Sequence, residues 1–193
     1  MEQKSSIPTG QHYICAVKEL YNGNKLKTEL ISEEHFLYRW WFPAESPIVK
    51  YLEAYLAQHP EDIDMHYVYS RLKRKMIGET TYFALYLGKS TNGRKRFGQH
   101  TRGTIKQSTL RETLRAILEL NGNPCKEEGI SNVLNDCYYE WMEFLEEDHE
   151  LIDSFEMMAI AIGYYPLNFD GNNSISESWK TAIIHKRKEL KDY

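Results

Sequence analysis

Arg96 and His100 are the residues whose types and spacing first suggest chemistry, because they stand four positions apart in a cationic segment that begins at Lys89. On a helix, residues four apart share one face. A guanidinium offers a fork of hydrogen-bond donors and an imidazole offers another, so this pair could clamp a phosphate group. An Arg/His pair can equally lie on a solvated helix surface, and further residues have to decide between the two interpretations.

Glu156 and Asn168 are the next polar candidates. Glu156 stands one helical turn after Ile152, on the inward-leaning side of a predicted helix. A carboxylate in such a place is costly unless it is paired or bound to a metal. It could therefore be a metal ligand or the partner of a lysine. Asn168 follows a Pro-Leu dipeptide, where asparagine can also serve as a cap or a turn residue.

Positive and negative charges are separated along the chain, although the net charge is only −4. Residues 89–115 contain eight Lys or Arg side chains and one acid, whereas residues 136–156 contain nine acids and no Lys or Arg. A second basic run covers residues 71–75. Clustered cations bind nucleic-acid phosphates, although many such runs are simply solvated. The residues expected to contact phosphates are Arg94, Lys95, Arg102, Lys106, Arg111 and Arg115.

The elements that must position these residues are predicted to be both strands and helices. Residues 80–88 are nearly continuous in aromatic and apolar types and are bounded by glycines, which indicates a strand in the middle of a sheet. Other predicted strands cover residues 12–17, 35–42 and 138–145, and the turn at residues 22–24 suggests that the first two form a hairpin. The class is α+β, with a small sheet flanked by helices.

Capping signals and apolar periodicity predict the helices. Ser46 followed by Pro47 begins one helix, and a second over residues 61–75 should bury Ile63 and Tyr67. The remaining predicted helices span residues 94–101, 109–121, 148–163 and 176–190. The helix over residues 109–121 begins with a capping box at Thr109, and Ser176 caps the last helix. Asp148 is the predicted cap of the helix over residues 148–163, in which Ile162 lies on the buried stripe.

The motif residues together resemble the GIY-YIG nuclease superfamily. The resemblance covers residues 36–173 outside an insertion, and Phe36-Leu37-Tyr38 is similar to the first tripeptide, with Phe36 in place of the usual glycine. The remaining matches are Tyr86-Leu87-Gly88-Lys89 at the second tripeptide, then Arg96, His100, Glu156 and Asn168. In the family the two tripeptides lie close together in sequence, whereas two predicted helices separate them here.

The resemblance also implies a domain organisation. The fold would be a small, mainly antiparallel central sheet flanked by helices, in a single domain over residues 1–193. Residues 1–34 would be an N-terminal extension, residues 44–78 an α-helical insertion between the two motif strands, and residues 174–193 a C-terminal helix. The inserted helices and residues 103–135 are candidates for specificity, which must come from outside the small catalytic core.

The implied activity is that of a metal-dependent endonuclease, which hydrolyses a phosphodiester bond by in-line attack of water. Tyr38 would be the general base, with Lys89 or the metal nearby to make its phenolate accessible. Glu156 would hold a single Mg²⁺ or Mn²⁺ ion. Arg96 would stabilise negative charge on the phosphoryl group in the transition state.

Three further site residues would support this chemistry. Tyr86 and His100 would orient the water, the tyrosine or the phosphate, and Asn168 would hold the loop behind the metal. Tyr82 is a rival for the role of the first tyrosine. We favour Tyr38, because tyrosines on neighbouring strands can lie about 5 Å apart. Two tyrosines at i and i+4 of one strand are separated by about 13 Å.

The implied substrate is DNA, most simply double-stranded, and a homodimer would be the simplest way to cut both strands. A nucleic-acid-binding module that keeps this scaffold without catalysis is the alternative, and a structural or partner-binding protein with tryptophans in its core is a third. No stretch is apolar enough for a bilayer and residues 1–6 lack the apolar core of a signal, so we expect a cytoplasmic protein without a membrane partner. Cys15, Cys125 and Cys137 are expected to be buried thiols.

Overall fold

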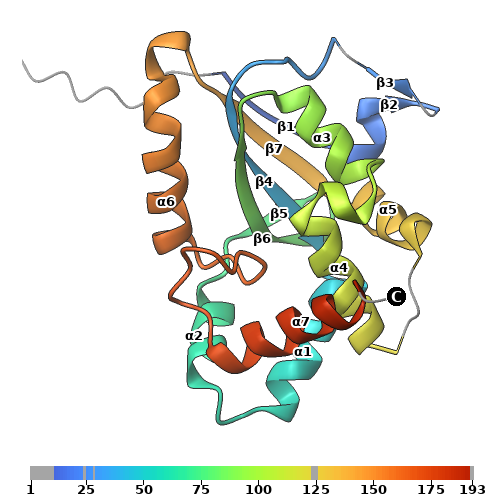
Figure 1. Ribbon diagram of the computed structural model, residues 1–193, viewed down its shortest axis with the longest axis vertical. Coiled ribbons are helices and arrows are strands. Elements are labelled where there is room, and N and C mark those ends of the chain that lie inside the picture. The colour runs from blue at the N-terminus through green and yellow to red at the C-terminus, as the bar shows by residue number, and fades with distance from the viewer. Residues whose placement is uncertain (1–10, 24, 28, 123–125, 192–193) are drawn as a thin grey trace, which may run out of the picture.

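A five-stranded antiparallel sheet forms the centre of the protein. The computed structural model describes residues 11–23, 25–27, 29–122 and 126–191. The sheet has the strand order β1-β7-β4-β6-β5 (Figure 1), and each neighbouring pair is antiparallel. Its strands are β1 (His12–Ala16), β4 (Phe36–Pro43), β5 (Arg74–Ile77), β6 (Thr80–Ser90) and β7 (Tyr138–Glu143). The predicted α+β class is therefore confirmed.

The predicted hairpin between β1 and β4 is wrong, because β7 lies between them. The registers place Trp141 of β7 opposite both Tyr13 of β1 and Tyr38 of β4. Tyr13 stacks on Trp141 with 5.0 Å between ring centroids. Packing between residues far apart in sequence thus decides the strand order. The turn at Gly23, with a φ of 59°, instead joins the short strands β2 (Tyr21–Asn22) and β3 (Lys25–Leu26), while Asn24 lies outside the described residues.

The central strand is β4, not β6 as the sequence suggested. Phe36, Tyr38, Trp40 and Phe42 alternate along β4 and belong to the main hydrophobic core. β6 lies between β4 and the edge strand β5, which pairs only with residues 80–83 of β6. The outer edge of β6 beyond that point is therefore left for another segment to bond.

Helices surround the sheet. They are α1 (Pro47–Gln58), α2 (Ile63–Arg71), α3 (Gly93–Thr101), α4 (Thr109–Leu120), α5 (Glu127–Asn135), α6 (Ile152–Gly163) and α7 (Glu177–Glu189). In Figure 1, α6 lies on one side of the sheet and α3, α4 and α5 on the other, while α1, α2 and α7 pack at one end. Ser46 and Ser176 cap α1 and α7 as predicted. Within the part of the chain that is described, no helix has the length and apolarity needed to cross a membrane.

The predicted second helix is too long. Residues 74–77 form β5, because the chain becomes extended at Leu72, where ψ is 133°. Ile63 and Tyr67 were expected to point inward, but they are 76% and 49% exposed because α2 buries a different face. Of the basic run at residues 71–75, Arg71 consequently ends α2, whereas Arg74 and Lys75 lie on the edge strand β5.

Two other helix predictions need correction, and one helix was missed. α6 begins at Ile152 after a 3-10 helix over Glu146–Leu151, so Asp148 is not its cap, and Ile162 is exposed rather than buried. The cap of α4 is Ser108, one residue before the predicted box, since its side chain accepts the Arg111 backbone N–H. α5 was not predicted at all.

A buried carboxylate links α1 and α2 to α7. Asp62 caps α2 by accepting the Met65 backbone N–H, and it also accepts hydrogen bonds from the Tyr55 and Ser176 hydroxyls at 2.7 and 2.6 Å. Ser176 is the N-cap of α7, so the Asp62 carboxylate stabilises the starts of both α2 and α7. Side chains from α1, the sheet and α7 share one hydrophobic core.

Cys15 and Cys137 are both free thiols. Cys137 is buried, as expected, whereas Cys15 is only half-buried and Cys125 lies outside the described residues.

Candidate active site

Tyr38 and Gly88 face each other across β4 and β6, and their contact explains the glycine of the second tripeptide. The register pairs the two residues directly. A Cβ atom at position 88 would lie 2.5 Å from the Tyr38 Oη atom. Only glycine therefore lets the Tyr38 ring lie over β6. The rings of Tyr38 and Tyr86 are 6.3 Å apart between centroids, as expected for tyrosines on neighbouring strands.

A bulge in β6 separates Tyr82 from this pair. The register shifts so that Trp40 pairs with Tyr86 and Trp41 with Ala84, which leaves Leu85 as the extra residue. The bulge reverses the alternation of side chains, so Tyr82 packs on the α6 side of the sheet while Tyr86 packs in the main core. Our expectation that Tyr82 and Tyr86 share a face is wrong, and Tyr38 is the tyrosine that lies beside Tyr86.

Phe36, where the family has a glycine, serves as a contact for α3. Its buried ring packs edge-on against Tyr38, with 6.1 Å between centroids. A Cβ atom at Gly93, the first residue of α3, would lie 1.2 Å from the Phe36 ring. The large side chain on β4 is thus accommodated by a glycine at the start of the helix that carries Arg96 and His100.

His100 is buried and forms a hydrogen-bonded chain with two hydroxyls. Its Nε2 atom lies 2.7 Å from the Tyr38 hydroxyl, and its Nδ1 atom lies 2.6 Å from the Ser108 hydroxyl. Burial, together with the positive charges of Arg96 and Arg111, lowers the pKa of His100 well below its ordinary value. The imidazole is therefore neutral near pH 7.

A neutral imidazole has one donor and one acceptor nitrogen, so the tautomer of His100 sets the direction of the chain. The Ser108 oxygen already accepts the Arg111 backbone N–H, and it can also accept the Nδ1–H of His100. In the tautomer with the proton on Nδ1, the Nε2 lone pair accepts the Tyr38 hydroxyl proton. Burial, followed by the neighbouring Tyr86 and Tyr139 hydroxyls, raises the pKa of Tyr38 well above its ordinary value, so the phenol keeps its proton near pH 7.

The charges of Arg96 and Glu156 shift the pKa values of Tyr38 and Tyr86 in opposite senses. Burial raises the pKa of Tyr86 as it does that of Tyr38; for each hydroxyl the Arg96 charge lowers the pKa and the Glu156 charge raises it. Arg96 is half-buried and donates from Nη1 to Gln99 at 3.3 Å. The fold therefore brings the tyrosine pair, one cation and one carboxylate from distant parts of the chain within electrostatic range.

Lys89 pairs with two carboxylates of α6. Its Nζ atom lies 2.7 Å from Asp153 Oδ1 and 3.2 Å from Glu156 Oε2. The hydrogen bond to Asp153, followed by the one to Glu156, raises the pKa of Lys89. The lysine pairing that the sequence allowed for Glu156 is thus present. The Glu156 side chain keeps 20% of its surface exposed.

The donor set around Glu156 fits a single hard cation. Mg²⁺ takes one or two protein carboxylates and completes its shell with waters and substrate phosphates. Glu156 and Asp153 provide those two carboxylates one turn apart on α6, although the described residues contain no cluster of three His, Cys, Asp or Glu side chains that could hold a metal. A neighbouring pocket of about 460 Å³ is lined by Lys89, Arg96 and Asp153, among others.

Asn168 bonds to β6 rather than to Glu156. Its side-chain oxygen accepts the Leu87 N–H at 2.9 Å, and its side-chain nitrogen donates to the Leu87 carbonyl at 2.7 Å. Leu167 N–H adds a bond to the Leu85 carbonyl at 3.1 Å. The segment thus takes the place of a strand on the free edge of β6, and it holds the backbone on both sides of Tyr86.

The six residues predicted to contact phosphates are not equivalent. Lys95, Arg102 and Lys106 are exposed, and Arg94 and Arg115 are half-buried. Arg111 is 1% exposed; its guanidinium donates to the His100 and Thr101 carbonyls at the end of α3 and pairs with Glu127 at 2.7 Å. Arg111 satisfies helix-terminal carbonyls and cannot form part of an exposed basic surface, so its predicted DNA contact does not fit the structure.

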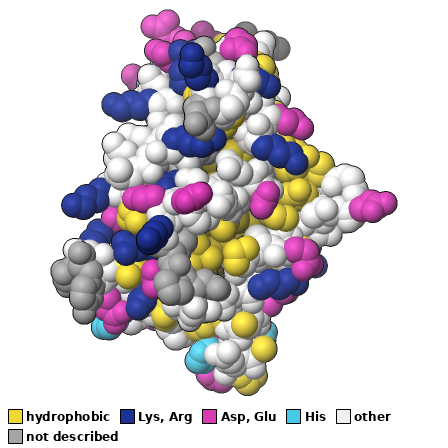
Figure 2. Space-filling model, turned by 90° about the vertical axis from the view of Figure 1, so that its right-hand side faces the viewer, with side chains coloured by type: hydrophobic (Ala, Val, Ile, Leu, Met, Phe, Trp, Pro, Cys, Tyr) yellow, Lys and Arg dark blue, Asp and Glu magenta, His cyan; other side chains and the backbone are white. Residues whose placement is uncertain are grey.

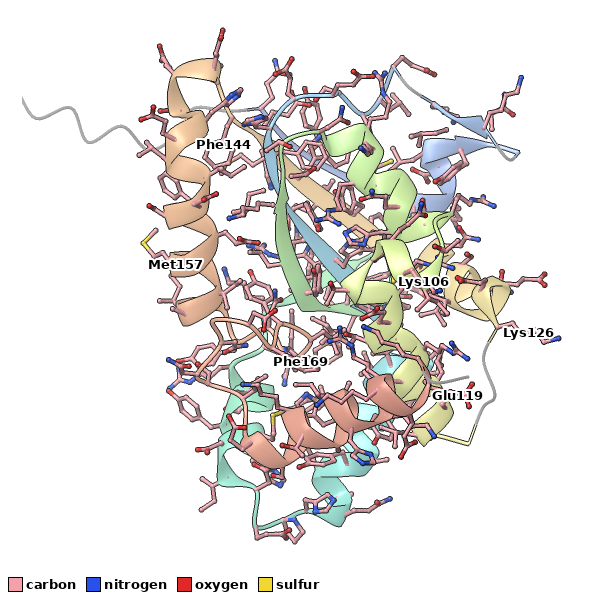
Figure 3. All side chains as sticks on the ribbon, in the orientation of Figure 1. Lys106, Glu119, Lys126, Phe144, Met157 and Phe169 are labelled. Carbon is pink, nitrogen blue, oxygen red and sulfur yellow. The ribbon has the colours of Figure 1, made fainter. Side chains whose placement is uncertain are left out.

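The exposed cations do not form one continuous patch on the face turned toward the viewer in Figure 2, where Lys and Arg side chains alternate with acidic and apolar ones. Lys106 projects near the start of α4 on the right of Figure 3, on the α3 side of the sheet. The fold therefore brings acidic and basic side chains together on this face, although they are separated along the sequence.

Ser108 is a site residue that our sequence reasoning missed. Its contact with His100 joins the end of α3 to the start of α4. The only signal in the sequence was its type, since serine is a common helix cap, and our prediction placed the cap at Thr109.

Comparison with known proteins identifies the family. The family model of the GIY-YIG catalytic domain matches residues 36–190, from the first residue of β4 to beyond the end of α7. Searches of curated proteins and of solved structures gave no match. The matched region contains every predicted site residue and most of the chain. The chain therefore belongs to the GIY-YIG nuclease superfamily.

Proposed function

We propose that this protein is an endonuclease that hydrolyses DNA phosphodiester bonds by attack of a water molecule. The family indicates nuclease activity, and its members generally depend on a divalent metal. The observation that carries the proposal is the hydrogen bond between the buried Tyr38 phenol and a neutral His100, close to one cation and one carboxylate. In a module that only binds nucleic acid, this arrangement would contribute to stability alone.

In this mechanism, Tyr38 passes a proton to His100. The pKa of the Tyr38 phenol is too high for a standing phenolate near pH 7. The attacking water instead gives its proton to the Tyr38 oxygen as the phenol gives its own proton to His100 Nε2, 2.7 Å away. A negative phosphate beside the site favours the imidazolium that results. Lys89, which we expected to activate Tyr38, pairs with Asp153 and Glu156 instead.

Arg96 provides the charge that acts on the phosphoryl group. It lines the pocket between α3 and the start of α6, and its guanidinium has free donors beyond the one bond to Gln99. Negative charge grows on the phosphoryl oxygens as water attacks, so a fixed cation there stabilises the transition state more than the ground state.

Glu156, with Asp153 beside it, would hold Mg²⁺ or Mn²⁺. Such an ion supplies Lewis-acid polarisation of a phosphoryl oxygen and stabilises the leaving oxygen. Asn168 keeps the Tyr86–Gly88 backbone in place, so Tyr38 stays in register with the strand it crosses. Duplex DNA as the substrate and a homodimer that cuts both strands complete the proposal.

The test is cleavage of supercoiled plasmid DNA by the purified protein with Mg²⁺ or Mn²⁺, with and without chelator. We expect nicked and linear products that a chelator abolishes. Arg96→Ala should reduce single-turnover cleavage by about 100- to 1,000-fold while weakening DNA binding only modestly, because its charge acts mainly on the transition state. The exposed neighbour Lys95→Ala is the matched control. Binding of DNA without any cleavage in either metal would favour the non-catalytic module.

A further inference from the structure

The C-terminal helix places one more arginine at the edge of the proposed site. Arg187 of α7 is only 18% exposed, and its Nη2 atom lies 2.5 Å from Glu112 Oε2 on α4. The other oxygen of Glu112 pairs with Lys191 at 3.0 Å. Two cations therefore share one carboxylate, and this group keeps a net positive charge.

Two contacts, one on α4 and one on α7, define where Arg187 lies. On α4, Glu112 stands one helical turn after Ser108, whose hydroxyl contacts His100, so Arg187 meets α4 one turn away from the Tyr38–His100 chain. On α7, the Trp179 indole donates to the Pro166 carbonyl, next to the segment that bonds β6 on both sides of Tyr86.

The position of the charge agrees with these anchors. Burial dominates the raised pKa of Tyr86, and the charge of Arg187, like that of Arg96, acts to lower it. Arg96 belongs to α3 and Arg187 to α7, so the two arginines approach Tyr86 from different elements.

We propose that Arg187 forms a second phosphate subsite, which binds a backbone phosphate next to the one held by Arg96 on the cleaved DNA strand. This inference rests on the proposed nuclease function and adds a residue that none of the sequence motifs contains. A guanidinium has five N–H donors in a fixed fork, and the bond to Glu112 engages one end of it, so the remaining donors can bind a phosphate.

Glu112 gives this subsite its geometry. Burial acts to raise the pKa of Glu112, but the hydrogen bonds from Arg187 and Lys191 outweigh it, so its pKa is lowered and the carboxylate stays ionised. An ionised, nearly buried partner holds the arginine in one orientation before DNA arrives, which reduces the entropy lost on binding. The same negative charge opposes the phosphate, so Glu112 lowers affinity while it orients Arg187.

The experiment measures binding of a short DNA duplex at several salt concentrations, with chelator present so that the DNA stays intact, and measures single-turnover cleavage separately with metal. Arg187→Ala should weaken binding about tenfold and reduce the slope of log affinity against log salt by about one. Lys188→Ala, at the exposed neighbouring position on α7, should change both quantities much less.

Glu112→Gln separates a phosphate ligand from a purely structural ion pair. It removes the opposing charge, so we expect tighter binding together with slower cleavage, because Arg187 is no longer held in place. A structural pair would give lower thermal stability with unchanged affinity per folded molecule. Arg187→Lys keeps the charge and should restore most of the salt slope even if Arg187→Ala folds poorly.

The outcomes distinguish the two proposals. If the unmodified protein binds and cuts DNA and Arg187→Ala keeps the affinity and salt slope of Lys188→Ala, the subsite is overturned while the nuclease function stands. If the unmodified protein neither binds nor cuts DNA, the proposed function itself fails, whatever the variants do.

Discussion

The two faces of the sheet bury polar groups in different ionisation states, neutral on one face and charged on the other. On the face toward α3, Tyr38 of β4 and His100 are both neutral, since burial raises the pKa of the phenol and lowers that of the imidazole. On the face toward α6, Glu140 of β7 is only 8% exposed, yet it is ionised.

The partners account for this difference. Glu140 lies 2.9 Å from Arg39 Nη1 and 2.8 Å from His12 Nε2, and it accepts the Trp41 indole N–H at 2.6 Å. Burial acts to raise the pKa of Glu140, but Arg39, Trp41 and Lys75 together outweigh it. The Tyr38–His100 pair has hydrogen-bond partners, but none of the described residues forms an ion pair with it. A buried group in contact with counter-ions stays charged. A buried group with neutral partners stays neutral and keeps a proton that it can transfer.

The largest effect should come from removing the charge on the α6 face. Glu140→Ala leaves the half-buried Arg39 guanidinium without its counter-ion and should lower the free energy of unfolding by about 3 kcal/mol. Urea unfolding measures this. Cleavage per folded molecule should stay near that of the unmodified protein, because Glu140 lies on the opposite face from His100. A loss of cleavage without loss of stability would contradict our separation of the two faces.

A smaller effect, mainly on activity, should follow from removing the Tyr38 hydroxyl. Tyr38→Phe should slow single-turnover cleavage by at least about 100-fold, as is typical for losing a general base, while DNA affinity stays nearly intact. The cost in stability should be about 1 kcal/mol, because His100 Nε2 loses its donor. Tyr82→Phe, the matched control on the α6 side, should be close to neutral. Reversed behaviour of the two variants would show that Tyr38 is only a core residue.

The smallest effect concerns the dependence of stability on pH, where the two faces should respond in different ranges. The folded-state pKa of His100 is depressed, so below about pH 6.5 the unfolded chain binds a proton that the folded protein does not. Stability should fall by at most about 1.4 kcal/mol per pH unit there, and His100→Gln should flatten this decline.

Glu140 contributes in a lower range, because its folded-state pKa is also depressed. Its stabilisation is present above the ordinary pKa of 4.5 and is lost as the pH falls through the folded-state value. Chemical unfolding at a series of pH values should therefore show two separable declines, and Glu140→Gln should remove the lower one. A single decline unaffected by His100→Gln would contradict the assignment of a neutral buried imidazole.

The sequence by itself determined the features that depend on neighbours a few residues away. The spacing of Arg96 and His100 placed both on α3, and Ser46 and Ser176 marked the starts of α1 and α7. The tripeptide around Tyr86 pointed to the family, because local spacing is preserved when the chain forms a strand followed by a helix.

Only the tertiary structure decided which distant segments meet. The insertion of β7 between β1 and β4 arises from aromatic pairs more than 100 residues apart, and the bulge at Leu85 reverses the faces of Tyr82 and Tyr86. Arg111 is of a residue type that commonly contacts DNA, but it is buried at the end of α3. These outcomes depend on burial and on cross-strand register, which are properties of the packed chain. The type and spacing of the residues alone do not predict burial or cross-strand register.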